Sequence, residues 1–259
     1  MIIILKNIKQ LVLIFIFLNS ANVMNAQPLK RDYVRTAIEL GLLISLEYDF
    51  FNLNSFQNKR KEAPNKFDNY FRDKLKWEKN KLDKAKLYSD ILLYGIVLGS
   101  IPASPLLLKG NDYKTIILTN LEVLAINGLL TDITKYVVGR QRPSSFFNTR
   151  DEKKDAFKSF FSGHTSSAFA IGTSNAMMLS SEYPNKKGII WISAYTIATL
   201  TGYYRIAADK HYTSDVIAGA IAGSLIGYLT QKSISKSYLS IKAEQSSPIS
   251  RGLKLTWRF

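Results

Sequence analysis

The chain has no cysteine among its 259 residues. It can therefore form neither a disulfide framework nor a metal site built on thiolates, and cysteine usage points to no cellular compartment. Histidine is almost as rare, with only His164 and His211. Acidic residues are in deficit, because 20 Asp and Glu face 35 Lys and Arg and leave a formal net charge of +15. This charge suits an anionic partner: nucleic acid, anionic lipid head groups or a phosphorylated substrate.

The N-terminus lacks an apolar run long enough to cross a bilayer. Lys6 and Lys9 precede an apolar stretch of eight residues, Leu11 to Leu18, and a small polar segment then ends at Ala26. A helix that spans a membrane needs about 20 apolar residues. The order of these segments is typical of a signal peptide. We predict that residues 1–26 are a signal peptide, with an uncleaved N-terminal anchor as the alternative.

Beyond residue 30 the sequence shows no internal repeat and no Gly/Ser linker. Apolar blocks separated by short charged stretches predict an all-α bundle of six core helices, either soluble or embedded in a membrane. Residues 30–231 form one predicted domain, with the motifs within 87–230. Residues 232–259 contain two alternating segments, SYLSIKAEQ and RGLKLTWRF, which predict a short β-like C-terminal tail or hairpin. The six predicted helices are Arg35–Phe51, Leu87–Leu108, Thr115–Lys135, Thr165–Ser181, Gly188–Ala208 and Ser214–Thr230.

A strongly charged stretch, residues 52–86, separates the first two blocks. Its apolar residues fall near one face of a helix, which predicts an exposed helix that covers the core. The alternative is a basic helix that lies on a membrane surface. The apolar residues concerned are Phe67, Tyr70, Phe71, Leu75 and Leu82.

The segment HYTSD contains the first candidate catalytic pair. On a helix His211 and Asp215 lie four residues apart on one face, so the carboxylate can hold one imidazole nitrogen and leave the other free to attack. Arg205, six residues earlier, has a planar guanidinium that suits two phosphoryl oxygens at once. This cluster points to phosphate chemistry.

Two further clusters carry suitable groups. Ser162, Gly163 and His164 stand directly before a predicted helix, where backbone amides bind anionic oxygen and an imidazole can donate a proton near neutral pH. Lys135 and Arg142 lie at a helix end that Pro143 terminates. Alone, those two cations are typical of compensation of the helix dipole. Together with the other clusters, they predict a site for a tetrahedral anion.

In order, the three clusters resemble the signature motifs of the type 2 phosphatidic acid phosphatase superfamily, which includes class A acid phosphatases and vanadium haloperoxidases. Lys135, Arg142 and Pro143 match its first motif. Ser162, Gly163 and His164 match the second, in which Phe161 replaces a proline. Arg205, His211 and Asp215 match the third, in which Tyr204 replaces a serine. Three spaced motifs in the right order are far more specific than any one of them.

The resemblance implies a role for each of these residues. His211 would attack phosphorus while Asp215 orients it, and His164 would protonate the leaving oxygen and then activate water. Charge on the equatorial oxygens would be stabilised by Lys135, Arg142, Arg205, the Ser162 hydroxyl and the Gly163 amide. It implies no metal and no cofactor.

The resemblance also implies a phosphatase that hydrolyses a phosphomonoester or pyrophosphate through a phosphohistidine. The expected partner is a phosphorylated lipid or a small phosphoester, with membrane contact and without nucleic acid. We expect an exported protein, either in the cell membrane with its site facing the periplasm or exterior, or soluble in the periplasm. Alternatives are a non-specific acid phosphatase, a vanadium-dependent haloperoxidase and a non-enzymatic basic protein that binds membranes.

Four aromatic residues between the first two motifs could grip an acyl or prenyl chain or simply pack: Phe146, Phe147, Phe160 and Phe161.

Overall fold

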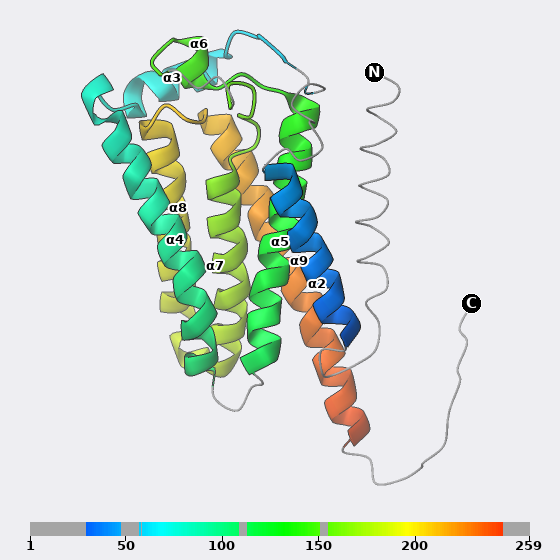
Figure 1. Cartoon of the computed structure of the whole chain (residues 1–259). Coiled ribbons are helices and arrows are strands. Elements are labelled where there is room, and N and C mark those ends of the chain that lie inside the picture. Colours follow the sequence, from blue (N-terminus) through cyan, green and yellow to red (C-terminus); the bar gives the residue numbers. More distant parts are fainter. Residues whose placement is uncertain (1–29, 48–56, 58, 109–112, 151–154, 246–259) are drawn as a thin grey trace.

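The computed structural model describes residues 30–47, 57, 59–108, 113–150 and 155–245, and in these residues it contains helices and no strand. Six long helices lie side by side (Figure 1). They confirm the predicted all-α bundle, since each begins and ends within a few residues of its apolar block except at the C-terminus. The six are α2 (Lys30–Glu47), α4 (Leu82–Leu107), α5 (Tyr113–Val138), α7 (Gly163–Glu182), α8 (Lys187–Ala207) and α9 (Thr213–Gln245).

Helix α7 lies in the middle of the bundle and packs against α4, α5, α8 and α9. Glycines four residues apart on α9 let the backbones of α7 and α9 touch. A Cβ atom at Gly223 would lie 2.1 Å from the main-chain oxygen of Ser166, and one at Gly227 would lie 2.3 Å from that of Ala170. Because only glycine fits there, these positions fix how α7 sits along α9.

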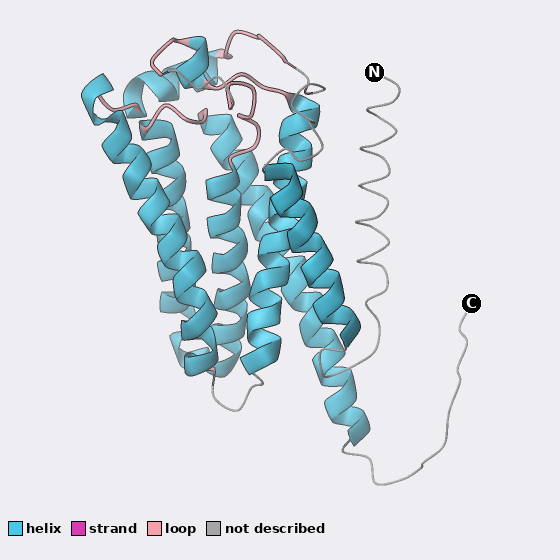
Figure 2. Cartoon of the chain, viewed as in Figure 1, coloured by secondary structure: helices cyan, strands magenta, loops and turns pink. Residues whose placement is uncertain are grey.

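The longer described loops gather at one end of the bundle (Figure 2). The C-terminal ends of α5 and α8 and the N-terminal ends of α7 and α9 meet there. Two short helices lie across the same end, α3 (Lys66–Leu75) and α6 (Pro143–Phe146), and Pro143 occupies the first turn of α6, where its missing N–H costs nothing. The single turns η2 (Lys79–Lys81) and η3 (Pro184–Lys186) precede α4 and α8. All three motifs of the sequence therefore reach the loop end.

Helix α3 differs from the expected core-covering helix. Its buried residues are charged, Asp68 and Arg72, whereas Phe67 and Tyr70 are exposed. The prediction of an apolar buried face was wrong for α3, because its inner side forms ion pairs with Asp209 and Arg140 in place of apolar contacts. Of the apolar residues concerned, Leu82 is buried, at the start of α4. The N-terminal side of α3 is closed by Asn65, whose side chain accepts a hydrogen bond from the Asp68 amide at 2.8 Å.

The C-terminal prediction is also corrected in part. SYLSIKAEQ belongs to α9, which continues as a helix to Gln245, so its alternation does not produce a strand. RGLKLTWRF lies outside the described residues, as does the predicted signal peptide or anchor of residues 1–26.

Among the described helices, α5 and the first 21 residues of α9 (Thr213–Ser233) are long and apolar enough to cross a membrane on length and composition alone.

Candidate active site

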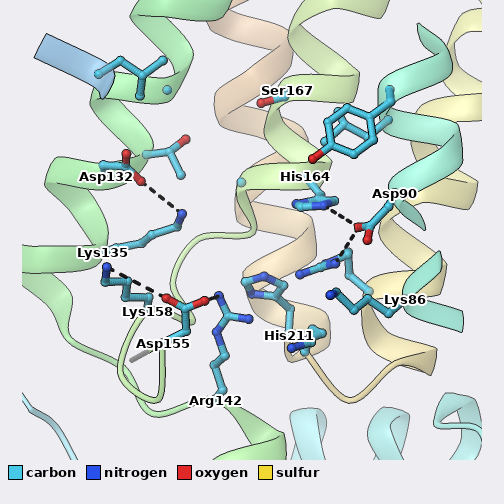
Figure 3. Close-up of a pocket in the computed structure, with 18 residues that line it drawn as sticks. Lys86, Asp90, Asp132, Lys135, Arg142, Asp155, Lys158, His164, Ser167 and His211 are labelled. Atoms are coloured by element: carbon cyan, nitrogen blue, oxygen red, sulfur yellow. Dashed lines mark hydrogen bonds and ion pairs between the residues drawn. The ribbon is translucent and has the colours of Figure 1, made fainter. Parts of the chain in front are cut away.

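A pocket of about 430 Å³ opens at the loop end of the bundle (Figure 3). It brings together residues of all three motifs, although they are distant along the chain. Both imidazoles and three motif cations line it: His164, His211, Lys135, Arg142 and Arg205, with Gly163. Ser162 and Asp215 have no exposed surface and are not part of its lining.

The imidazole of His211 is held by the main chain. Its Nδ1 lies 2.8 Å from the carbonyl oxygen of Ser159, whereas Oδ2 of Asp215 lies 3.9 Å away. A carbonyl oxygen can only accept, so Nδ1 donates the proton and Nε2 keeps its lone pair. The direct hydrogen bond to Asp215 expected from the HYTSD spacing is therefore replaced by one that His211 donates to the Ser159 carbonyl.

Asp215 instead acts on His211 through Ser159. The Ser159 hydroxyl donates to Oδ2 of Asp215 at 2.6 Å, and the Tyr212 amide donates to the same oxygen at 3.0 Å. These bonds fix both the Ser159 segment and the turn that carries His211. No sequence motif marks Ser159, which lies 52 residues before His211 and meets it only in the folded chain.

The pKa of His211 favours the neutral ring. Burial lowers this pKa well below its usual 6.5, and the charges of Arg142, Arg205 and Lys135 lower it further. The bond to the Ser159 carbonyl acts in the opposite direction but is outweighed. At neutral pH the ring is therefore unprotonated, as a nucleophile requires.

His164 is paired with a residue that sequence reasoning missed. Its Nε2 lies 2.8 Å from Oδ1 of Asp90 on α4, and the guanidinium of Arg205 lies 3.5 Å from the same oxygen. Burial and the charge of Arg205 lower the pKa of His164 to about 4, against the opposing effect of the Asp90 carboxylate. A general acid needs the protonated imidazole, so an added negative charge in the pocket, such as a bound phosphoryl group, is required to favour that form. The only signal in the sequence is a single acidic residue at the start of an apolar block.

The three motif cations, Lys135, Arg142 and Arg205, line the pocket from different elements. Lys135 lies in the last turn of α5, where its Nζ contacts Oδ1 of Asp132 at 3.1 Å. A Cβ atom at Gly163 would lie 3.4 Å from that Nζ, so the ammonium lies close to the start of α7. Arg142 precedes α6, and its Nη2 lies 3.8 Å from Oδ2 of Asp155.

Ser162 occupies a different place from the one expected. Its hydroxyl lies 2.9 Å from the Thr165 hydroxyl, and its amide donates to the main-chain oxygen of Asp215 at 3.1 Å. It joins the starts of α7 and α9 and does not face the pocket.

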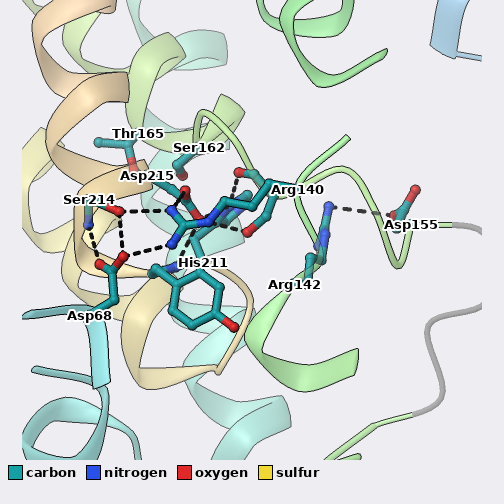
Figure 4. A network of polar contacts seen from close by, with 11 residues as sticks. Asp68, Arg140, Arg142, Asp155, Ser162, Thr165, His211, Ser214 and Asp215 are labelled. Carbon is teal, nitrogen blue, oxygen red and sulfur yellow. Dashed lines mark hydrogen bonds and ion pairs between the residues drawn. The ribbon is translucent and has the colours of Figure 1, made fainter. Parts of the chain in front are cut away.

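A partly buried guanidinium connects α3 to the start of α9, just after His211 (Figure 4). Arg140 donates to Oδ1 of Asp215 at 2.5 Å, to the Ser214 hydroxyl at 2.8 Å and to Oδ2 of Asp68 at 2.7 Å. Asp68 and Asp215 are both fully buried. Arg140 lies two residues before Arg142, and neither its spacing nor its neighbours distinguish it in the sequence.

A second buried pair holds the same turn. Arg72 of α3 forms two hydrogen bonds with Asp209, at 2.6 and 2.8 Å, and lies over the ring of Phe147. Asp209 has φ of 59°, a left-handed conformation that Asp tolerates better than most residues. The turn between α8 and α9, which carries His211, is therefore held from α3 at two points.

The four aromatic residues proposed to grip a lipid chain are not among those lining the pocket. Phe161 is buried, and Phe146 and Phe147 pack edge to face with a centroid distance of 4.9 Å. These residues therefore pack within the protein, which was the alternative to gripping a lipid chain. The apolar part of the pocket wall comes instead from Leu43 of α2 and from Leu93 and Tyr94 of α4.

Comparison with known proteins identifies the family of this chain. The sequence model of the PAP2 superfamily matches residues 117–238. An undecaprenyl-diphosphatase from Sulfolobus acidocaldarius is 31% identical over 160 residues, which cover 61% of this chain and 69% of that protein. The chain belongs to the PAP2 superfamily.

Two further proteins illustrate the range of similarity to this PAP2 protein. A lipid A 1-phosphatase from Porphyromonas gingivalis is 35% identical over 106 residues, which cover 41% of this chain but only 21% of that longer protein. A solved transmembrane PAP2 type phosphatidylglycerolphosphate phosphatase from Bacillus subtilis covers 80% of this chain and 98% of its own. Its sequence identity is 20% and its TM-score 0.44.

The two residues that depart from the PAP2 motifs, Phe161 and Tyr204, both pack against neighbouring residues. Phe161, in place of proline, is buried beside the start of α7. Tyr204, in place of serine, packs its ring against Trp77 and Tyr88 at centroid distances of 5.7 and 5.3 Å. Both side chains therefore support the loop end and do not line the pocket. Asp68, which binds Arg140, and Asp90, which binds His164, lie before the matched residues 117–238.

Proposed function

We propose that this PAP2 protein is a lipid phosphate phosphatase that works through a phosphohistidine at His211. The observation that carries the proposal is the orientation of His211. Its Nδ1 is engaged by Ser159, so the unprotonated Nε2 is the nitrogen available for attack on phosphorus. The pocket also holds a second imidazole and three motif cations, the set that phosphoryl transfer needs.

The reaction would proceed in two displacements. Nε2 of His211 attacks phosphorus, the bond from phosphorus to the leaving oxygen breaks, and His164 gives its proton to that oxygen. His164 then takes a proton from water as the water oxygen attacks phosphorus, the bond from phosphorus to Nε2 of His211 breaks, and inorganic phosphate leaves. Lys135, Arg142 and Arg205 stabilise the charge on the equatorial oxygens throughout.

A lipid substrate is supported by the outer surface of the bundle. Large apolar side chains are exposed on three helices, and a surface of this kind is typical of a site that contacts membrane or protein. The relatives are named as phosphatases of lipid A and of undecaprenyl diphosphate. We therefore propose a membrane location, with the lipid tail leaving the pocket past Leu93 and Tyr94. The exposed side chains are Leu87, Ile91 and Leu98 of α4, Ile189 and Ile192 of α8, and Ile221, Leu225 and Leu229 of α9.

The test is phosphate release by the full chain in detergent, measured on a panel of lipid phosphates and on a soluble aryl phosphate. We expect release from lipid phosphates and complete loss in His211→Ala. A trapped phosphoenzyme that is stable in base and labile in acid would identify phosphohistidine. Halide oxidation dependent on added vanadate, without phosphate release, would contradict the proposal and favour a haloperoxidase.

A further inference from the structure

Two fully buried carboxylates share one guanidinium beside the turn that carries His211 (Figure 4). Asp68 of α3 and Asp215 of α9 each form an ion pair with Arg140, at 2.7 and 2.5 Å. In the part of the chain that the structure describes, no second lysine or arginine pairs with either carboxylate. The three groups together therefore carry one net negative charge.

The hydrogen bonds of this cluster show that both acids are ionised. Oδ1 of Asp68 accepts from the Ser214 amide at 2.9 Å, and its Oδ2 accepts from Arg140. Oδ1 of Asp215 accepts from Arg140, and its Oδ2 accepts from the Tyr212 amide at 3.0 Å. Amide and guanidinium groups can only donate, so all four carboxylate oxygens act as acceptors. A proton on either acid would have to displace one of these donors.

The proposed reaction creates a positive charge next to this cluster. Nε2 of His211 uses its lone pair to form the bond to phosphorus as the bond from phosphorus to the leaving oxygen breaks. Nδ1 keeps the proton that it donates to Ser159, so the ring becomes a phosphoimidazolium cation. The three motif cations oppose a positive charge on this ring. A negative charge nearby offsets their effect, and Oδ2 of Asp215 lies 3.9 Å from Nδ1.

We propose that Asp68 is a positioning residue for phosphoryl transfer, which acts on the nucleophile through the guanidinium that it shares. Because Arg140 is divided between two carboxylates, it offsets only part of the charge of Asp215. The remaining negative charge stabilises the cationic ring of phosphorylated His211. This inference rests on the proposed phosphatase function.

Asp68 also fixes the place of the charge that it modulates. It accepts a hydrogen bond from the amide of Ser214, an N–H in the first turn of α9 that has no acceptor within its own helix. The start of α9, which carries Asp215, is thereby held against α3. Asp68 lies before residues 117–238, so it belongs to a part of this chain that the PAP2 model does not match.

The test separates the two half-reactions, because the proposed charge acts on them in opposite directions. The full chain in detergent is mixed rapidly with p-nitrophenyl phosphate, and release of nitrophenolate gives the rate of phosphohistidine formation. Decay of radiolabelled phosphoenzyme after removal of substrate gives the rate of hydrolysis. Asp68→Asn should slow formation by about 10-fold, as expected for one weakened charged hydrogen bond. Hydrolysis should not slow, because the ring loses its positive charge in that step.

Three control variants distinguish the charge of Asp68 from its shape. Ser214→Ala removes a hydroxyl from the same cluster without a change of charge, so both half-reactions should change in the same direction. Asp68→Glu keeps the charge and should form the phosphoenzyme faster than Asp68→Asn. Asp73→Asn removes an exposed carboxylate from the same helix and should leave both rates as in the wild type.

A second measurement keeps the proposal testable if Asp68→Asn does not fold. The chain has two histidines, so His164→Ala leaves His211 as its single imidazole. This variant lacks the group that activates water, and p-nitrophenyl phosphate can still load it because nitrophenolate leaves without a proton. NMR of isotope-labelled histidine nitrogens in this phosphoenzyme should show a protonated Nδ1 at neutral pH. An unprotonated Nδ1 overturns the proposal, since no cation is then present for the cluster to stabilise.

The outcomes of the kinetic test are distinct. Slower formation with hydrolysis that is not slowed supports the charge role of Asp68. Equal slowing of both half-reactions, or no change in either, overturns that role. A wild-type protein that releases phosphate from neither p-nitrophenyl phosphate nor lipid phosphates overturns the phosphatase proposal itself.

Discussion

The carbonyl oxygen of Ser159 accepts the Nδ1 proton of His211 at 2.8 Å and so selects the tautomer of the proposed nucleophile. Asp215 acts on the imidazole only indirectly, because its hydrogen-bond partner is the Ser159 hydroxyl and not the ring of His211. Asp215 also forms an ion pair with the partly buried Arg140. The acid of the third motif therefore supports the nucleophile through the backbone of another segment.

This arrangement predicts that Asp215→Asn retains measurable activity. The Ser159 carbonyl still accepts from His211, but a charged hydrogen bond worth about 1.5–3 kcal/mol is lost, so kcat should fall by about 10- to 100-fold. Phosphate release is the measurement. Asp73→Asn, whose side chain is 74% exposed, is the matched control and should behave as wild type. A variant as inactive as His211→Ala would contradict an indirect role for Asp215.

Asp90 is predicted to position His164 for proton donation. Asp90→Asn should lower kcat/KM for an alkyl or lipid phosphate by about 10- to 100-fold, the effect of one lost charged hydrogen bond. The loss should be much smaller for p-nitrophenyl phosphate, because a nitrophenolate leaves without a proton. Equal losses on both substrates would mean that Asp90 serves Arg205 or the fold, and not the acid step.

The depressed pKa of His211 predicts a pH-dependent stability. The unfolded ring takes up a proton near pH 6.5, but the folded ring does so only at lower pH. Between these two values the unfolded state holds more protons, so stability falls as pH falls. The loss is about 1.4 kcal/mol for each pH unit below 6.5.

Thermal unfolding of wild type and His211→Gln between pH 5 and 7 measures this effect. Replacing the imidazole by an uncharged amide should flatten the fall in the unfolding midpoint below pH 6.5. Identical slopes in the two proteins would show that the His211 ring is already protonated in the fold.

Contact between the backbones of α7 and α9 predicts a strict need for glycine. Gly223→Ala places a methyl group 2.1 Å from the Ser166 oxygen and should destabilise the protein by about 1–3 kcal/mol, the usual cost of overpacking. Activity should fall too, because α7 begins with Gly163 and His164, and α9 follows His211. The matched control is Gly99→Ala on α4, where a Cβ atom meets nothing within 4 Å. Unfolding and phosphate release should distinguish the two variants, and equal behaviour would contradict the packing.

Local sequence patterns predict much of the fold and of the candidate site. Apolar blocks of helical length predict the six long helices, since a helix is stabilised by contacts three and four residues apart. The motif spacing predicts which imidazoles and cations belong together. The same reasoning failed for SYLSIKAEQ, because short alternating segments suit a strand or a helix and the preceding helix simply continues.

The sequence by itself determined the all-α bundle, the excess of positive charge and the three clusters that line the pocket. Tertiary structure decided which group holds each of them: Ser159 for His211, Asp90 for His164, and Asp68 with Arg140 for Asp215. These partners lie 52 or more residues apart along the chain, so no periodicity records them. They meet because close packing of α7 against α9 and burial of charged residues of α3 bring distant polar groups to one end, where each buried charge needs a partner.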